Sequence, residues 1–285
     1  MEVSKNPPLY FDTLNYFYRM TIAALKEYLE DQYRAYHRPE YLRMDPLVCL
    51  GAFDRPRDRE TGALVAAVLA YGRAEIIIRN VTEIFRLTGR SIAAFAAETT
   101  LKHKIRTFAG FKHRFTEGYD IAVLLHGVGK ILARYGSLEA LFAAGFEASD
   151  PTIKSALDRF TGAILDITHE TAPLRDAGVG YLLSSPKNGS ACKRLNMYLR
   201  WMVRKRDGID LGIWETVPAA TLIMPVDTHV ARISRQLGLT RRNAVDWRMA
   251  EEITGALRSC DAADPIRYDF SLCRAGMVHF RRDAA

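Results

Sequence analysis

Apolar residues recur at intervals of three and four along most of this chain, and the segments between them are rich in Gly, Pro and Asp. This spacing puts apolar side chains on one face of a helix. No alternating apolar run is long enough to predict a sheet, so we expect an all-α fold. The pattern predicts helices at 61–71 with Thr61 as N-cap, at 77–88 ended by Gly89, at 120–136, at 247–258 with Asp246 as N-cap, and from Asp264-Pro265 to Met277.

Length and composition bound the class of protein. With 285 residues and 48% hydrophobic content, the chain can bury a full core as one large domain or two small ones. A net charge of +7 points towards a polyanionic partner or an anionic membrane surface, although many soluble proteins are equally basic. Apolar runs are short and the N-terminus has no signal-peptide pattern, so we expect a cytoplasmic protein without a membrane partner.

The segment Pro-Val-Asp-Thr-His-Val-Ala-Arg at 225–232 carries the clearest chemical signal. Asp227 is a candidate N-cap, apolar residues follow it at helical spacing, and Gly238 can end the helix. A helix N-terminus carries about half a positive charge, which keeps a neighbouring carboxylate ionised at neutral pH. An ionised carboxylate beside basic residues such as Arg232 suits an enzyme that holds a polyanion and stabilises a developing cation.

This segment, followed by Leu-Gly-Leu at 237–239, resembles the signature of endonuclease III-like DNA glycosylases of the helix-hairpin-helix superfamily. The resemblance is strong over residues 185–280, and the chain looks closest to a poorly characterised bacterial branch. It implies one helical unit over residues 1–285 with two lobes, and a catalytic segment at 225–238. It also implies that Asp227 supports departure of a damaged base through an oxocarbenium-like transition state. Ala63–Arg73 is similar to an early family helix and its DNA-probing loop, which implies that Tyr71 and Arg73 probe the duplex.

The family hairpin is expected within residues 185–202, where a turn leads into a helix. Pro186 and Gly189 match the family's first proline and last glycine, and Lys187 or Asn188 replaces its other glycine. Including the segments described above, the candidate DNA contacts are Lys187, Asn188, Gly189, Ser190, Arg194, His229, Arg232, Tyr71 and Arg73.

A second segment, Leu125–Lys130, also reads like the family hairpin, with Gly-Val-Gly at 127–129. It falls inside the helix predicted at 120–136 and lies far before Asp227 in the chain. Glycine costs about 1 kcal/mol in a helix interior. We therefore expect close helix packing at Gly127 and Gly129 and no DNA-binding turn.

Lys193 is the candidate nucleophile of a Schiff-base reaction. It falls in the first turn of the predicted helix beside Arg194, where the helix terminus and a like charge disfavour its ammonium form. A strict count puts the family lysine near Ala191, two positions earlier. The alternative is that Lys193 only binds phosphate, in which case Asp227 alone would activate water.

Aromatic residues near these segments are candidates for a pocket that holds an extruded base, namely Tyr198, Trp201 and Trp214. Aromatic residues at helical spacing also pack as core, so this assignment has a structural alternative. His229 lies two residues after Asp227, and these positions diverge on a helix. We therefore expect His229 to hydrogen-bond the hairpin or a phosphate and not to hold a metal.

Four cysteines, at 49, 192, 260 and 273, bear on cofactors. Several endonuclease III relatives hold an iron–sulfur cluster on four closely spaced cysteines near the C-terminus, where this chain has only Cys260 and Cys273. No Cys-x-x-Cys pair occurs. We predict no iron–sulfur cluster and no metal site, and leave open a monovalent cation that steadies the hairpin.

The sequence thus predicts a base-excision repair DNA glycosylase that acts on duplex DNA with a damaged base, with AP lyase activity if Lys193 forms a Schiff base. Its expected location is the cytoplasm, at the nucleoid. One alternative is a non-catalytic nucleic-acid-binding protein on the same scaffold. The other is a hydrolase of a different N-glycoside. The lesion and the oligomeric state are not specified by these motifs.

Overall fold

The structure is a computed structural model that describes residues 21–172, 178–205 and 207–282. Nearly all of its regular structure is helical, which confirms the all-α prediction. The elements are α2 Ile22–Tyr36, η2 Pro39–Met44, η3 Pro46–Ala52, α3 Pro56–Val68, α4 Ala74–Thr88, α5 Ile92–Glu98, α6 Leu101–Thr107, β1 Lys112–His113, β2 Thr116–Glu117, α7 Gly118–Tyr135, α8 Leu138–Ala143, α9 Lys154–Thr171, α10 Gly178–Leu182, η4 Pro186–Asn188, α11 Lys193–Val203, η5 Ala219–Thr221, α12 Thr228–Gln236, α13 Trp247–Arg258 and α14 Asp269–Arg282.

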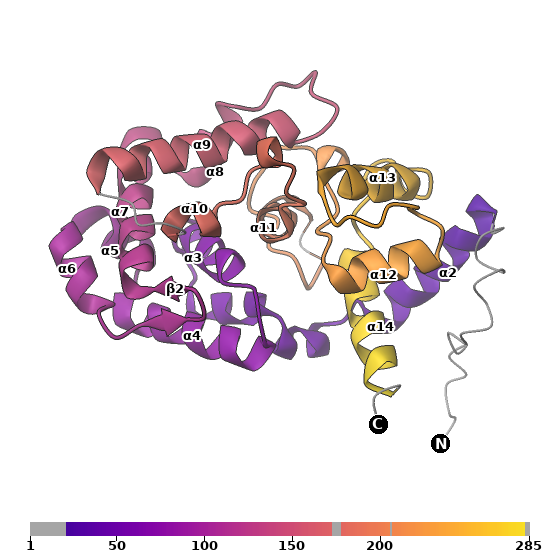
Figure 1. Cartoon of the computed structure of the whole chain (residues 1–285), viewed down its shortest axis with the longest axis horizontal. Coiled ribbons are helices and arrows are strands. Elements are labelled where there is room, and N and C mark those ends of the chain that lie inside the picture. The colour runs from indigo at the N-terminus through magenta and orange to yellow at the C-terminus, as the bar shows by residue number, and fades with distance from the viewer. Residues whose placement is uncertain (1–20, 173–177, 206, 283–285) are drawn as a thin grey trace.

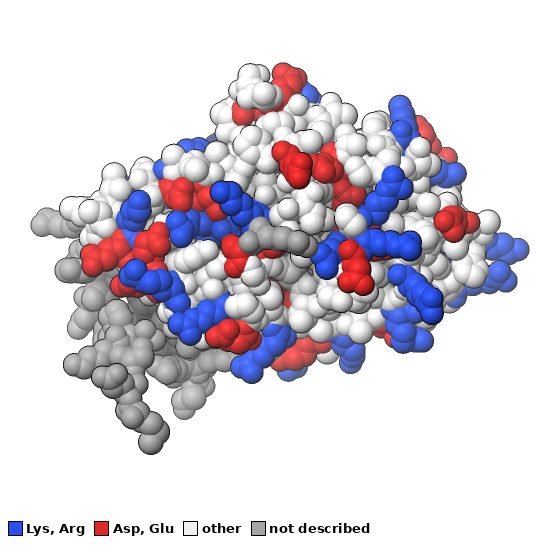
Figure 2. All heavy atoms as spheres, turned by 180° about the vertical axis from the view of Figure 1, so that it is seen from behind, with Lys and Arg blue, Asp and Glu red and all other residues white. Residues whose placement is uncertain are grey.

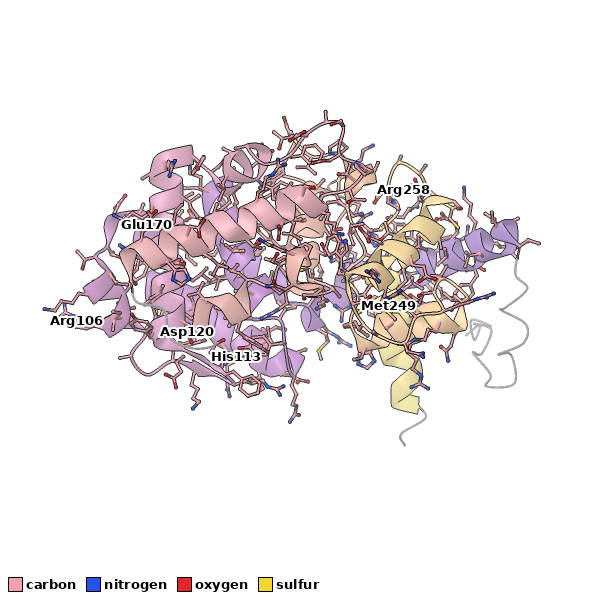
Figure 3. The ribbon with its side chains drawn as sticks, turned by 45° about the horizontal axis from the view of Figure 1, so that its top comes forward. Arg106, His113, Asp120, Glu170, Met249 and Arg258 are labelled. Carbon is pink, nitrogen blue, oxygen red and sulfur yellow. The ribbon has the colours of Figure 1, made fainter. Side chains whose placement is uncertain are left out.

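The helices lie in two groups (Figure 1). In the first group, α7 packs against α5, α6, α8, α9 and α10. In the second group, α14 packs against α12 and against α2 from the other end of the chain. Helix α11 lies between the groups and packs on α3. Figure 3 shows the same division from another side, with Asp120 of α7 and Arg258 of α13 far apart.

Several predicted helix boundaries are confirmed. Gly89 ends α4 with a φ of 74°, a left-handed value that glycine adopts without strain. The 120–136 helix is α7, which Gly136 ends, and it begins two residues earlier than predicted. Asp246 caps α13 by accepting a hydrogen bond from the Met249 amide at 2.8 Å.

Two predicted boundaries are wrong. Thr61 does not cap a helix, because α3 already begins at Pro56 and Thr61 is buried in its interior. The last helix begins at Asp269 and not at Asp264-Pro265. The Asp264 carboxylate pairs with Arg204 at 3.0 Å, and residues 265–268 form turns before α14.

The glycines of the 125–130 segment pack closely, as predicted. Both lie inside α7. A methyl group on Gly127 would overlap the Thr168 side chain, and one on Gly129 would overlap the main-chain carbonyl of Ala96. This segment is therefore a helix contact and does not form a hairpin.

Buried acids on α3 cap two other helices. Asp58 accepts hydrogen bonds from the Ser91 hydroxyl at 2.6 Å and the Ala93 amide at 2.9 Å, at the start of α5. Glu60 accepts from the amides of Leu138 at 2.9 Å and Glu139 at 2.6 Å, at the start of α8. A carboxylate at a helix N-terminus satisfies free amides and complements the helix dipole. These contacts fix α3 within the first group.

Among the described residues, no helix has an apolar stretch long enough to cross a membrane.

Replacing Glu60 with glutamine is expected to lower the free energy of unfolding by about 1–3 kcal/mol. Glu60 accepts three hydrogen bonds, the third from Trp214 Nε1 at 2.8 Å. In the glutamine variant an amide nitrogen replaces one of the two oxygens, and this nitrogen cannot accept the hydrogen bond of the donor that it faces. Urea denaturation measures the change. Glu251→Gln is the matched control, since Glu251 is partly exposed and makes a surface ion pair of 3.7 Å with Lys154. Equal losses in the two variants would contradict the capping role.

Candidate functional site

A cleft of about 510 Å³ opens between the two groups of helices. Its walls come from η3, the loop between α3 and α4, the face of α11, and the starts of α12 and α14. Its polar and charged lining residues are Asp45, Tyr71, Tyr181, Lys193, Arg194, Arg200, Asp227, Thr228, His229, Asp269, Cys273 and Arg274.

Helix α11 presents one face to the cleft. Lys193 is its first residue, and Met197 and Arg200 follow at the spacing that aligns side chains along a helix. The Lys193 side chain is half-buried, and its Nζ lies 3.4 Å from Met197 Sδ. The chain enters the helix through Cys192, which has a φ of 47°. This turn brings Lys193 to the mouth of the cleft.

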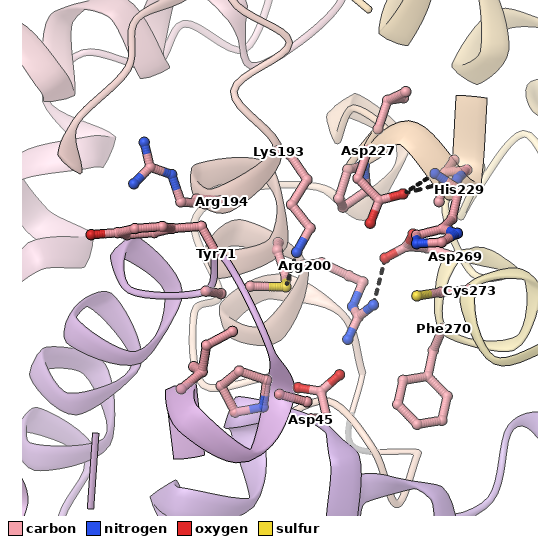
Figure 4. Close-up of a pocket in the computed structure, with 18 of the residues that line it drawn as sticks. Asp45, Tyr71, Lys193, Arg194, Arg200, Asp227, His229, Asp269, Phe270 and Cys273 are labelled. Carbon is pink, nitrogen blue, oxygen red and sulfur yellow. Dashed lines mark hydrogen bonds and ion pairs between the residues drawn. The ribbon is translucent and has the colours of Figure 1, made fainter. Parts of the chain in front are cut away.

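Asp227 lies across the cleft from Lys193 (Figure 4). As predicted, it is the N-cap of α12, and its Oδ1 accepts hydrogen bonds from the amides of His229 and Val230, both at 2.9 Å. Pro225 and Val226 before it are buried, which fixes the chain at this point. Figure 4 shows the side chains of Lys193 and Asp227 pointing into the same space.

Buried ion pairs form the floor of the cleft. Arg200 donates to Asp210 at 3.1 Å and to Asp269, the first residue of α14, at 2.5 Å. Arg274 of α14 donates to Asp45 at 2.8 Å. Sequence reasoning missed these residues. The spacing from Lys193 to Arg200 is a helical repeat that could have indicated Arg200, but the acids come from distant parts of the chain.

Cys273 also lines the cleft. Burial raises the pKa of its thiol to about 12, and the nearby charges of Asp227 and Asp269 add to this effect. The thiol is therefore protonated at neutral pH. Because the thiolate is the reactive form, Cys273 does not compete with an amine as a nucleophile.

Tyr71 and Arg194 belong to the wall of the cleft. The Arg194 guanidinium donates to the carbonyls of Val68 at 2.8 Å and Tyr181 at 2.5 Å, and it lies 5.3 Å from the centre of the Tyr71 ring. Figure 4 shows it pointing away from Lys193. Burial lowers the pKa of the guanidinium. Arg73 is exposed at the start of α4, just outside the cleft.

The predicted hairpin forms a tight turn between α10 and α11. Gly189 has a φ of 75°, whereas the second left-handed residue is Cys192 and not Asn188. Lys187, Asn188 and Gly189 are exposed. The Lys187 amide donates to Ser185 Oγ, the Asn188 amide to the Ser185 carbonyl, and the Gly189 amide to the Pro186 carbonyl, so all three bonds lie within the turn.

Other contacts tie this hairpin to α13. The amide of Trp247, the first residue of α13, donates to the Gly189 carbonyl at 3.0 Å, and Ser190 pairs with Asp246 through a single β-bridge. No side chain in the described part of the chain caps α11 by a hydrogen bond at Cys192. The hairpin is thus joined to the start of α13 through the main chain.

His229 and Arg232 are exposed on α12, and His229 lines the cleft. Across residues 21–172, 178–205 and 207–282, no three His, Cys, Asp or Glu side chains come together as metal ligands.

The predicted aromatic base pocket is not formed by the residues expected. Tyr198 and Trp201 are fully buried and Trp214 is 3% exposed, and none of them lines the cleft. Tyr198 and Trp201 lie on the side of α11 that faces the core, and the ring of Tyr198 packs edge to face on that of Trp214, which follows α11, at 5.5 Å. The structural alternative is therefore the correct one for these three residues.

Comparison with known proteins gives one match. Residues 45–278 match the family model described as "Protein of unknown function (DUF2400)". No curated protein and no solved structure matches the chain. Because the matched residues span most of the sequence, the chain belongs to the DUF2400 family.

Proposed function

We propose that the protein is a DNA glycosylase that cleaves the N-glycosidic bond of a damaged base. The observation that carries this proposal is the placement of Lys193 and Asp227 on opposite walls of one cleft. An amine and a fixed carboxylate facing the same space suit a reaction in which positive charge develops on a sugar. The cleft volume of about 510 Å³ is large enough for an extruded nucleoside.

The carboxylate of Asp227 has a defined task in this reaction. As the bond between the sugar and the base breaks, the sugar gains oxocarbenium character, and a nearby anion stabilises it. The amides of His229 and Val230 hold Oδ1 at 2.9 Å, so the carboxylate does not have to reorganise during the reaction. A fixed charge of this kind is more effective than a mobile one.

Lys193 can act in either of two ways in this reaction. As a neutral amine it would attack C1′ of the sugar, so that a C–N bond to the enzyme forms as the bond to the base breaks. The C1′–O4′ bond of the sugar would then break, with the proton lost from nitrogen taken up by O4′, to give a Schiff base that permits strand cleavage by elimination. As an ammonium ion it would bind phosphate, and water would attack C1′ instead.

The arrangement of α10, the turn at 183–192 and α11 supports a helix-hairpin-helix unit. The two groups of helices with the cleft between them support the two-lobed glycosylase fold as part of the same proposal. In this arrangement the hairpin and the start of α12 lie on either side of the reacting sugar. Both segments would contact the DNA backbone.

The charge distribution is consistent with a localised DNA contact. Figure 2 shows one face of the molecule, where basic and acidic side chains are interspersed. Lys187 on the hairpin and Arg232 on α12 are exposed cations next to the catalytic segments. We therefore place the duplex along the hairpin and α12.

Borohydride trapping tests the catalytic assignment. On duplexes with an abasic, 8-oxoguanine, oxidised-pyrimidine, uracil or alkylated site, the wild type is expected to act on one of them. A covalent adduct that Lys193→Ala does not form would assign Lys193 as the nucleophile, and base release without an adduct would assign Lys193 to phosphate binding. Asp227→Asn is expected to slow base release by about 10²–10³-fold. Asparagine is an equally good N-cap, so α12 is retained in this variant.

Lys102→Ala is the matched control for the loss of a lysine, because Lys102 is exposed on α6 and does not line the cleft. It is expected to behave like the wild type. Absence of both an adduct and base release on every duplex, with DNA binding retained, would contradict the proposal and favour a non-catalytic nucleic-acid-binding protein.

A Lys187→Ala variant tests the DNA-binding surface. Loss of one phosphate contact is expected to weaken duplex binding and to reduce the slope of log K against log salt concentration by about one. Fluorescence anisotropy at several salt concentrations measures both quantities. Lys102→Ala is the control, since Lys102 is exposed on α6, which lies at the far end of the molecule from α12. A salt slope that does not change in Lys187→Ala would remove the hairpin from the DNA contact.

A further inference from the structure

The turn between β1 and β2 carries an unusually exposed aromatic residue. Phe115 is 68% exposed, the largest value among the large hydrophobic side chains of the described residues. Tyr181, 38% exposed, lies next to it with a ring-centre distance of 6.0 Å. Exposed aromatic residues that cluster beside a cleft mark a surface that binds a partner.

The base of this turn is held firmly. The Tyr71 hydroxyl donates to the His113 carbonyl at 3.0 Å and lies 2.6 Å from the Thr116 hydroxyl. Asn80 of α4 donates to the Lys112 carbonyl at 3.3 Å, and its Nδ2 lies 3.0 Å from Nδ1 of the buried His113 ring. Figure 3 places His113 in the first group of helices. Phe115 is therefore presented to solvent on a fixed support.

A row of aromatic rings connects Phe115 to the cleft. The Tyr181 ring packs edge to face on Tyr71 at 5.4 Å, and both tyrosines line the cleft that contains Lys193. The Arg194 guanidinium lies 4.9 Å from the Tyr181 ring and 5.3 Å from the Tyr71 ring. The row thus runs from the wall of the cleft to the molecular surface and ends at Phe115.

The surroundings of Phe115 are basic. The Arg114 guanidinium lies 5.6 Å from the Phe115 ring, and Lys112 is exposed three residues before Phe115. The Arg114 side chain also lies against Gly72, which precedes the exposed Arg73. Glu117, the acid closest to the turn in sequence, caps α7 through its side chain. An exposed aromatic ring flanked by cations is complementary to stacked bases between phosphates.

We propose that Phe115 is a wedge that inserts between base pairs when a duplex lies across the cleft, with Arg114 at the adjacent phosphate. This inference rests on the proposed function, because an enzyme that acts on a base must first take it out of the stack. An apolar side chain inserted at a base step unstacks the duplex, which costs a few kcal/mol. Additional contacts between the protein and the bent DNA offset this cost. Tyr181 and Tyr71 form the inner wall along which the extruded nucleotide reaches Lys193 and Asp227.

Permanganate oxidation of unstacked thymines tests the wedge directly. The probe is a duplex with a tetrahydrofuran abasic-site analogue flanked by thymines. Wild type and Phe115→Trp are expected to make these thymines reactive, and Phe115→Ala is expected to reduce their reactivity about tenfold. Because Phe115 is exposed, the alanine variant is expected to unfold at the same temperature as the wild type.

Ile22→Ala is the matched control, since Ile22 is also exposed, at 60%, but lies on α2. It is expected to behave like the wild type. Wild-type thymine reactivity in Phe115→Ala would contradict the wedge. A shift of that variant from dimer to monomer with unchanged DNA opening would also contradict it, and would assign Phe115 to a protein interface.

Base release by the same set of variants, measured on duplexes with a damaged base, separates the glycosylase proposal from the wedge proposal. Base release with full thymine reactivity in Phe115→Ala would contradict the wedge and leave the glycosylase intact. Opening that depends on Phe115 without base release on any substrate would support the wedge and contradict the glycosylase. A wild-type protein that neither binds nor opens the duplex would contradict both.

Discussion

The buried ion pairs of Arg200 fix the geometry on which the site depends. Arg200 lies on the same face of α11 as Lys193, and its guanidinium binds Asp210 and the first residue of α14, Asp269. Helix α14 packs against α12, which begins at Asp227. The contact therefore links the helix that carries the lysine to the helix that carries the acid. A buried pair of this kind is costly to break, because removal of one partner leaves an uncompensated charge.

This linkage has a chemical consequence. Catalysis by fixed charges requires that the groups are already in place when charge develops on the substrate. Asp227 is held by two amides, and Lys193 begins a helix whose position the ion pairs set. Around them, Arg194 ties the tyrosine wall to the main chain, and the wall leads to Phe115 at the surface. The cleft thus joins the proposed reacting centre to a rim that the same contacts hold in place.

Local signals in the sequence predicted much of this arrangement. The cap at Asp227, the turn at Gly189 and the position of Lys193 in the first turn of α11 depend on residues close in the chain, and the structure contains all three. Long-range packing could not be predicted in this way. The sequence predicts that Tyr198 and Trp201 line a pocket. Met197 and Arg200 lie on the same face of α11 as Lys193 and line the cleft, whereas Tyr198 and Trp201 face the core. The prediction that Thr61 caps a helix is wrong for the same reason. The acids Asp58 and Glu60 lie inside α3 and are buried because they cap α5 and α8, which lie far along the sequence.

The most direct test of the account is a crystal structure of the Asp227→Asn variant bound to a duplex with a base that the wild type releases. The account predicts that the target nucleotide is extruded into the cleft, with C1′ about 3–3.5 Å from Lys193 Nζ or from an ordered water, and with residue 227 beside the sugar. A duplex bound elsewhere on the molecule, with the cleft empty of nucleotide, would contradict it.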